Sequence, residues 1–107
     1  MMSKLIITSE AKVHILEIYE YLRDQTGDSS FARGFINELQ EKCDILKDFP
    51  EIGTFLMDSN IESSVLRYLV HKNYIILYRY SNSENTSYVL TCFHSRRDLR
   101  RMVRKYM

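Results

Sequence analysis

The chain has 107 residues, of which 45% are hydrophobic and 27% charged, and its net charge at neutral pH is +1. This length predicts a single domain over residues 1–107, and the composition is typical of a soluble protein that builds its own core. No apolar run approaches the roughly 20 residues that a membrane span needs, and no basic-then-apolar signal opens the chain. We therefore expect a cytoplasmic protein without a membrane partner.

The small net charge hides two halves of opposite sign. Residues 1–64 hold six lysines and arginines against twelve acidic residues, a net charge of −6. Residues 65–107 hold nine against two, a net charge of +7. Such a division favours a surface that faces an acidic partner or nucleic acid. Alternatively, the two halves meet and neutralise each other within the fold.

Few residues in the chain suit a metal or a cofactor. Cys43 and Cys92 lie far apart and match no zinc-binding spacing, so we expect both to be reduced and buried. His14, His71 and His94 are scattered and form no metal-binding pattern. The three glycines supply no phosphate-binding loop. We expect neither a metal nor a cofactor.

The first residues predict a strand and then a helix. KLIIT, residues 4–8, is a β-branched run typical of a strand. Ser9 and Glu10 suit the start of a helix, and Gly27 suits its end. Between them, apolar residues recur at the spacing of one helix face, namely Ile15, Ile18, Tyr19 and Leu22.

A second helix is predicted from the cap candidates Asp28 to Ser30 onward. Its apolar stripe runs for about five turns, through Phe31, Phe35, Ile36, Leu39, Cys43 and Leu46. It must end near Phe49, because the residue before a proline avoids helical angles. The short connection predicts an antiparallel helix hairpin, and Gly34 suggests that the two helices approach closely.

The second half predicts a loop and then three strands. Residues 50–64 indicate a loop, and β-rich runs follow at 65–70, 73–80 and 87–94, with His71 and Lys72 in a hairpin-length gap. The order of elements predicts an α+β fold, in which a helix hairpin packs on a mainly antiparallel sheet.

Alternation along residues 73–80 indicates a sheet that is covered on both faces. One face carries Tyr74, Ile76, Tyr78 and Tyr80. The other face carries Ile75, Leu77 and Arg79. Both faces are largely apolar, so both must be covered. We expect the helix hairpin on one face and the C-terminal segment, a partner chain or both on the other.

The C-terminal residues predict a short basic helix. Its apolar stripe is Leu99, Met102, Val103 and Tyr106. Off that stripe lie Arg97, Arg100, Arg101, Arg104 and Lys105. Such a helix can bind a membrane or an acidic partner, or pack on its own sheet and leave its arginines in water. We assign partner contact to Arg79, Arg97, Leu99, Arg100, Met102, Val103 and Tyr106.

One cluster suits chemistry. His94, Arg96 and Arg97 follow the last strand, and we expect Arg67 and Arg79 beside them on neighbouring strands. Histidine and arginine can cleave RNA without a metal, because one activates the 2′-OH while the other stabilises the phosphorane charge. His94, Arg96 and Arg67 are therefore catalytic candidates if the protein is a nuclease. Alternatively, His94 ends a strand with a backbone partner, and the arginines extend to solvent from the sheet edge.

Five segments in order resemble the ParE branch of the RelE/ParE toxin superfamily of type II toxin–antitoxin modules. They are EAKVHILEIYEYL, FARGFINELQEKCDIL, DFPEIG, VLRYLVHKNYIILYRY and VLTCFHSRRD, which together cover nearly the whole chain. The resemblance implies a helix hairpin on a small antiparallel sheet. It also implies a cognate antitoxin that covers the toxin, in a plasmid-stabilisation-like module.

The resemblance implies two possible activities. RelE-type members cleave mRNA on the ribosome with basic residues on the middle strands and an arginine after the last strand. Arg96 stands at the position of that arginine, but Leu66, Tyr68 and Ile75 occupy positions of the other basic residues. ParE-type members lack that set too and inhibit DNA gyrase by binding it.

We therefore expect a gyrase-binding toxin with an antitoxin partner. A ribosome-dependent endoribonuclease and a non-toxic relic that only binds an antitoxin are the alternatives. A homodimer or a toxin–antitoxin hetero-oligomer is compatible with each.

Overall fold

The computed structural model describes residues 2–56 and 66–106. A strand, two helices and a short 3-10 turn come first, as β1 (Lys4–Ile7), α1 (Ser9–Thr26), α2 (Ser29–Asp44) and η1 (Ile45–Lys47). Strands and a final helix follow, as β2 (Thr54–Phe55), β3 (Leu66–His71), β4 (Tyr74–Ser81), β5 (Thr86–His94) and α3 (Leu99–Tyr106). The predicted α+β order, with its short C-terminal helix, is confirmed.

The strands form one mixed sheet in the order β1-β5-β4-β3-β2. The neighbours β3, β4 and β5 are antiparallel, as predicted, and β1 adds in parallel to β5. The two-residue strand β2 was not predicted, because residues 50–64 were expected to be a loop. Thr54 and Phe55 pair with Tyr68 and Arg67 of β3. Residues 57–64 of that expected loop lie outside the described residues.

The first helix begins one residue earlier than its sequence indicates. Thr8, not Ser9, is the N-cap, and its hydroxyl accepts a hydrogen bond from the backbone N–H of Ala11 at 3.2 Å. The same hydroxyl donates to the carbonyl of Val89 at 2.8 Å, so the cap also ties α1 to β5. The helix ends as predicted at Gly27, which has the positive φ of 68° that glycine tolerates.

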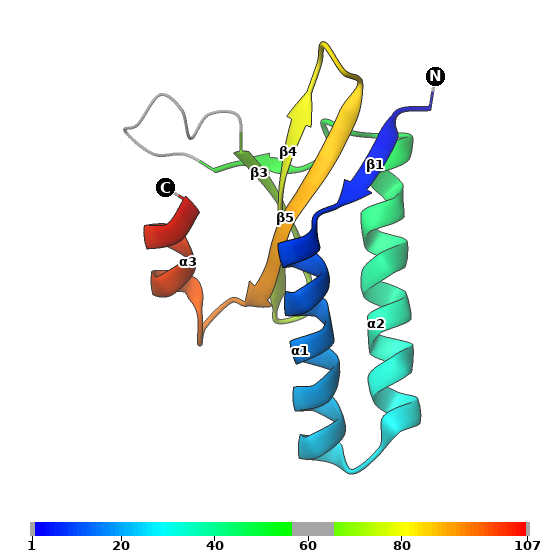
Figure 1. Ribbon diagram of the computed structural model, residues 1–107, viewed down its shortest axis with the longest axis vertical. Coiled ribbons are helices and arrows are strands. Elements are labelled where there is room, and N and C mark those ends of the chain that lie inside the picture. Colours follow the sequence, from blue (N-terminus) through cyan, green and yellow to red (C-terminus); the bar gives the residue numbers. More distant parts are fainter. Residues whose placement is uncertain (1, 57–65, 107) are drawn as a thin grey trace.

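The second helix corrects two expectations. Phe31 is 49% exposed, because it lies at the tip of the helix hairpin, which projects beyond the sheet (Figure 1). Gly34 is exposed, and an added Cβ there would meet nothing within 4 Å, so it does not mark a close helix approach. Of the remaining stripe, Phe35, Leu39, Cys43 and Leu46 are buried as predicted, and Ile36 is half-buried.

The sheet is covered on both faces, as its alternation predicts. Figure 1 shows α1 and α2 on one side of the sheet and α3 on the other. The hairpin core includes Ile15, Leu39, Leu46, Ile76, Tyr78, Val89 and both buried, free cysteines. The opposite face has a smaller core of Leu66, Leu77, Phe93 and Met102, so the C-terminal segment supplies part of its cover.

The hairpin between β3 and β4 turns one residue later than predicted. Lys72 and Asn73 connect the strands, whereas His71 is the last residue of β3. Lys72 adopts a positive φ of 55° in this turn.

Candidate functional site: the C-terminal helix and the His94 turn

An apolar groove of about 260 Å³ lies between α3 and the sheet. It is lined by Leu56, Tyr68, Ile75, Leu77, Phe93, Leu99, Met102 and Tyr106. Three of the residues predicted for partner contact, Leu99, Met102 and Tyr106, therefore share one surface. The side chain of Val103, a fourth, lies outside the described part of the structure. Leu99 is 44% exposed at the mouth of this groove, whereas Met102 is buried.

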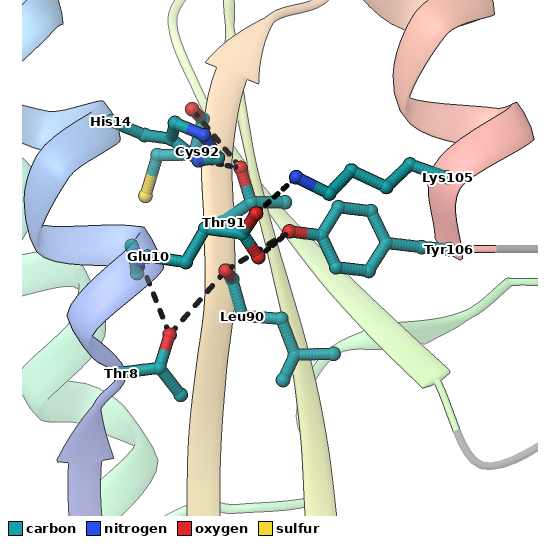
Figure 2. Close-up of polar contacts among 9 residues, drawn as sticks. Thr8, Glu10, His14, Leu90, Thr91, Cys92, Lys105 and Tyr106 are labelled. Carbon is teal, nitrogen blue, oxygen red and sulfur yellow. Dashed lines mark hydrogen bonds and ion pairs between the residues drawn. The ribbon is translucent and has the colours of Figure 1, made fainter.

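The C-terminal end of α3 is attached to α1 through Glu10. Figure 2 shows Lys105 and the hydroxyl of Tyr106 each donating to one carboxylate oxygen of Glu10. The bond from Lys105, followed by that from Tyr106, holds the pKa of Glu10 below its usual value of 4.5. Burial and the bond to Glu10 raise the pKa of Tyr106. Glu10 was predicted only as a favourable first-turn acid, because the sequence does not show that α3 returns to α1.

The N-terminal end of α3 is attached through His94, the last residue of β5. Its Nδ1 accepts hydrogen bonds from the backbone N–H groups of Arg96 and Arg97, each at 3.2 Å. These two bonds assign the ring as neutral, with its proton on Nε2. Burial, and next the positive charge of Arg97, lower the pKa of His94 below 6.5. His94 is thus a strand-ending histidine with backbone partners, one of the two predicted alternatives.

This arrangement limits the acid–base chemistry of His94. The lone pair that could accept a proton already accepts two backbone N–H groups. A general base must reach the proton that it removes, with a free lone pair. Arg96 is exposed beside this turn, and the guanidinium of Arg97 lies 4.1 Å from the ring centre of Tyr21.

Arg67 and Arg79 do not join His94. In the sheet His94 lies opposite Tyr74, whereas Arg79 lies opposite Tyr88. Arg79 is five residues beyond Tyr74 along β4, a separation of roughly 16 Å at about 3.3 Å per residue. The predicted cluster is therefore split between two ends of the strands, because the sequence indicates the strands but not their register.

Each of these two arginines has a local contact. Arg67 donates to the carbonyls of Glu51 at 2.8 Å and Gly53 at 3.0 Å, and its guanidinium lies 3.8 Å from the ring centre of Phe55. The guanidinium of Arg79 lies 4.7 Å from the ring centre of Tyr88. Arg67 therefore fastens the segment before β2 to the sheet.

Tyr78 fastens the same segment from within the core and was not predicted to do so. Its hydroxyl donates to the carbonyl of Pro50 at 2.8 Å and accepts from the backbone N–H of Gly53 at 2.9 Å. The sequence indicates this contact only in that a buried tyrosine hydroxyl needs a hydrogen-bond partner.

The structure describes no helix, within residues 2–56 and 66–106, that is long and apolar enough to cross a membrane. Nor do three histidine, cysteine or acidic side chains of those residues converge as metal ligands.

The chain matches the family model for the ParE toxin of type II toxin–antitoxin systems over residues 5–99. It belongs to this family of toxins. The match extends from β1 to the first residue of α3, so the rest of α3 lies beyond it.

Two solved structures resemble this ParE-family chain in fold. One is the RelBE2 toxin–antitoxin complex from Mycobacterium tuberculosis, with a TM-score of 0.65 and 14% identity, covering 88% of this chain and 99% of the other. The second is the chromosomal ParDE toxin–antitoxin system of P. aeruginosa, with a TM-score of 0.71 and 16% identity, covering 87% and 96%. A search among curated protein sequences finds no match.

Proposed function

We propose that this ParE-family toxin arrests growth by binding DNA gyrase rather than by cleaving mRNA. The observation that carries the proposal is the state of His94, whose Nδ1 accepts two backbone N–H groups. Arg67, the third catalytic candidate, binds two carbonyls near β2 instead. Metal-free RNA cleavage needs a base and a cation at one phosphate. The separation of these side chains favours a toxin that acts by binding.

We also propose that a cognate antitoxin neutralises the toxin and covers the apolar groove beside α3. The groove leaves apolar side chains accessible next to cations: Leu99 is 44% exposed, and the next residue, Arg100, is exposed as well. Arg79 shares the sheet face of Ile75 and Leu77, by strand alternation. These features fit a partner segment that combines apolar and acidic residues. The two similar structures, a toxin–antitoxin complex and a toxin–antitoxin system, support a partner of this kind.

The mechanism is tested by variants that remove chemistry but keep the fold. His94→Asn retains an acceptor for the turn but cannot transfer a proton, and Arg96→Ala removes the exposed cation. We expect induced expression of either variant to arrest growth as strongly as the unchanged chain. Colony counts after induction, at protein levels matched by immunoblot, measure this.

Two results would contradict the proposal. If folded His94→Asn and Arg96→Ala both lose toxicity while the unchanged chain cuts ribosome-bound mRNA, the protein is a nuclease. If the unchanged chain expresses in folded form without slowing growth, it is a relic. Co-expression of a short acidic protein from the neighbouring reading frame should restore growth and tests the antitoxin separately.

A further inference from the structure

We propose that α3 is a detachable cover of the apolar groove and that His94 is the proton-sensitive lock at its hinge. With a neutral ring the turn before α3 is closed and the helix lies on the sheet. With a protonated ring the turn loses its two central hydrogen bonds, and the N-terminal end of α3 is released from the sheet. The proposal concerns residues 94–106 and does not rest on the choice between gyrase and mRNA.

Few side chains of α3 are buried against the sheet. Met102 is the one buried residue of α3 whose side chain the structure describes, while Tyr106 is half-buried and Leu99 is 44% exposed. Beneath them the groove keeps about 260 Å³ of space between helix and sheet. Side chains across such a space lose contacts that a close-packed interface would supply. The polar attachments at the two ends of α3 therefore matter for its position.

The attachment at the N-terminal end is centred on His94. Besides the two bonds at Nδ1, the carbonyl of His94 accepts from the backbone N–H of Asp98 at 3.1 Å. The carbonyl of Asp98 then accepts from Met102 at 3.0 Å, in the first turn of α3. Protonation would place a third N–H at Nδ1, against the two that now donate to it. The turn cannot keep its geometry in that state.

The other groups around His94 do not stabilise the positive charge that its ring gains on protonation. Tyr74 of β4 meets the ring edge-on, with the ring centres 5.4 Å apart. His94 also lines a second pocket, between α1, β5 and α3. The remaining titratable and charged groups that line this pocket or flank the ring are His14, Glu17 and Tyr21 of α1, Cys92 of β5, Arg96, Arg97 and Asp98 of the turn, and Arg101 of α3. Asp98 is paired with Arg101 at 3.4 Å. Among the described residues no carboxylate bonds to the ring, and cations outnumber acids around it.

The direction of the pH effect follows from this environment. The pKa of His94 is lower when the turn is closed than the usual 6.5 of a free histidine. The open state therefore binds more protons, so the contribution of His94 to closure is fully present above about pH 6.5 and weakens as pH falls. Glu10, at the other end of α3, has a pKa lowered from 4.5 and stays ionised in the same range. Only the hinge end of the cover is released between pH 7 and pH 5.

Amide hydrogen exchange of the full chain, read by NMR, tests this device. We expect protection of the α3 amides, corrected for intrinsic exchange, to fall by up to about tenfold for each pH unit below pH 6.5. Amides of β4 and β5 serve as the internal reference and keep their protection. In the unchanged chain at pH 7, the ring nitrogen spectrum of His94 should show Nδ1 without a proton.

Variants distinguish the lock from general acid sensitivity. His94→Asn places an acceptor near Nδ1 that does not titrate, so α3 should be equally protected at pH 5 and pH 7. His14→Gln and His71→Gln remove the other two histidines and should leave the pH response of α3 intact. A His94→Asn chain that loses α3 protection in acid as the unchanged chain does would overturn the proposal. Equal loss of protection in β5, or no loss in α3 at pH 5, would do so as well.

Discussion

At the scale of single residues, the molecule uses polar side chains to fasten segments that its core does not reach. Tyr78 is fully buried, yet its hydroxyl bonds to Pro50 and Gly53 on the segment before β2. Arg67, the cross-strand partner of Tyr78, binds the same segment through the carbonyls of Glu51 and Gly53. His94 likewise fixes the turn before α3. Each of these side chains therefore has a structural role in positioning a segment of the chain, and that role involves no substrate.

The Tyr78 contact predicts the effect of a methyl group at Gly53. A Cβ at this buried position would lie 2.5 Å from the ring and hydroxyl of Tyr78, so one of the two must move. We expect Gly53→Ala to lower the free energy of unfolding by about 1–3 kcal/mol, as overpacking does. Urea unfolding followed by circular dichroism measures the change.

Gly34→Ala is the matched control for that variant. Gly34 is helical and exposed, and its added Cβ would touch nothing within 4 Å. Here the same change should raise stability by about 0.5–1 kcal/mol, because glycine is unfavourable inside a helix. A Gly53→Ala chain as stable as Gly34→Ala would show that the Tyr78 contact is not tight.

At the scale of elements, periodicity predicted much of the fold. The apolar stripes of α1 and α2 and the alternation along β4 each mark a face that must be buried. These patterns can therefore be identified from the sequence alone. β2 was missed because two residues carry no periodicity and become a strand only by pairing with Tyr68 and Arg67. The N-cap was missed by one residue, because Thr8 and Ser9 are both good caps and only the fold selects between them.

That selection predicts unequal effects of two neighbouring variants. Thr8→Ala removes the acceptor for Ala11 and the bond to Val89, and we expect it to cost about 1–2 kcal/mol of stability. Ser9→Ala lies inside the first turn and should cost less than about 0.5 kcal/mol. Thermal and urea unfolding of the two variants compare them. A larger loss for Ser9→Ala would place the cap at the residue that the sequence first indicated.

The candidate site was less predictable than the fold, and the reason is register. His94, Arg67 and Arg79 all lie near strand ends in the sequence, so they suggested one cluster. The pairing of His94 with Tyr74 and of Arg79 with Tyr88 separates them along β4. The alternation of apolar and polar residues along a strand predicts the sheet face on which each side chain lies. It does not predict which residue of the neighbouring strand lies opposite.

At the scale of the whole molecule, the acidic and basic halves meet in part. Lys105 pairs with Glu10, and Lys72 pairs with Glu38 at 3.2 Å, so lysines of the basic half bind carboxylates of the acidic half. Arg96, Arg100 and Arg104 are exposed and have no acidic partner among the described residues. Some charges of the two halves therefore pair within the fold. The remaining arginines form a basic surface around α3, beside the apolar groove.

Gyrase binding, the activity that we propose for this ParE-family toxin, can be tested directly. The most direct measurement adds the purified chain to a DNA supercoiling reaction over a wide concentration range, with a ribosome and mRNA cleavage reaction in parallel. We predict that supercoiling is blocked or cleaved DNA is trapped, that mRNA stays intact, and that His94→Asn behaves in the same way. Unaffected gyrase together with cut ribosome-bound mRNA would contradict gyrase binding as the activity of this toxin.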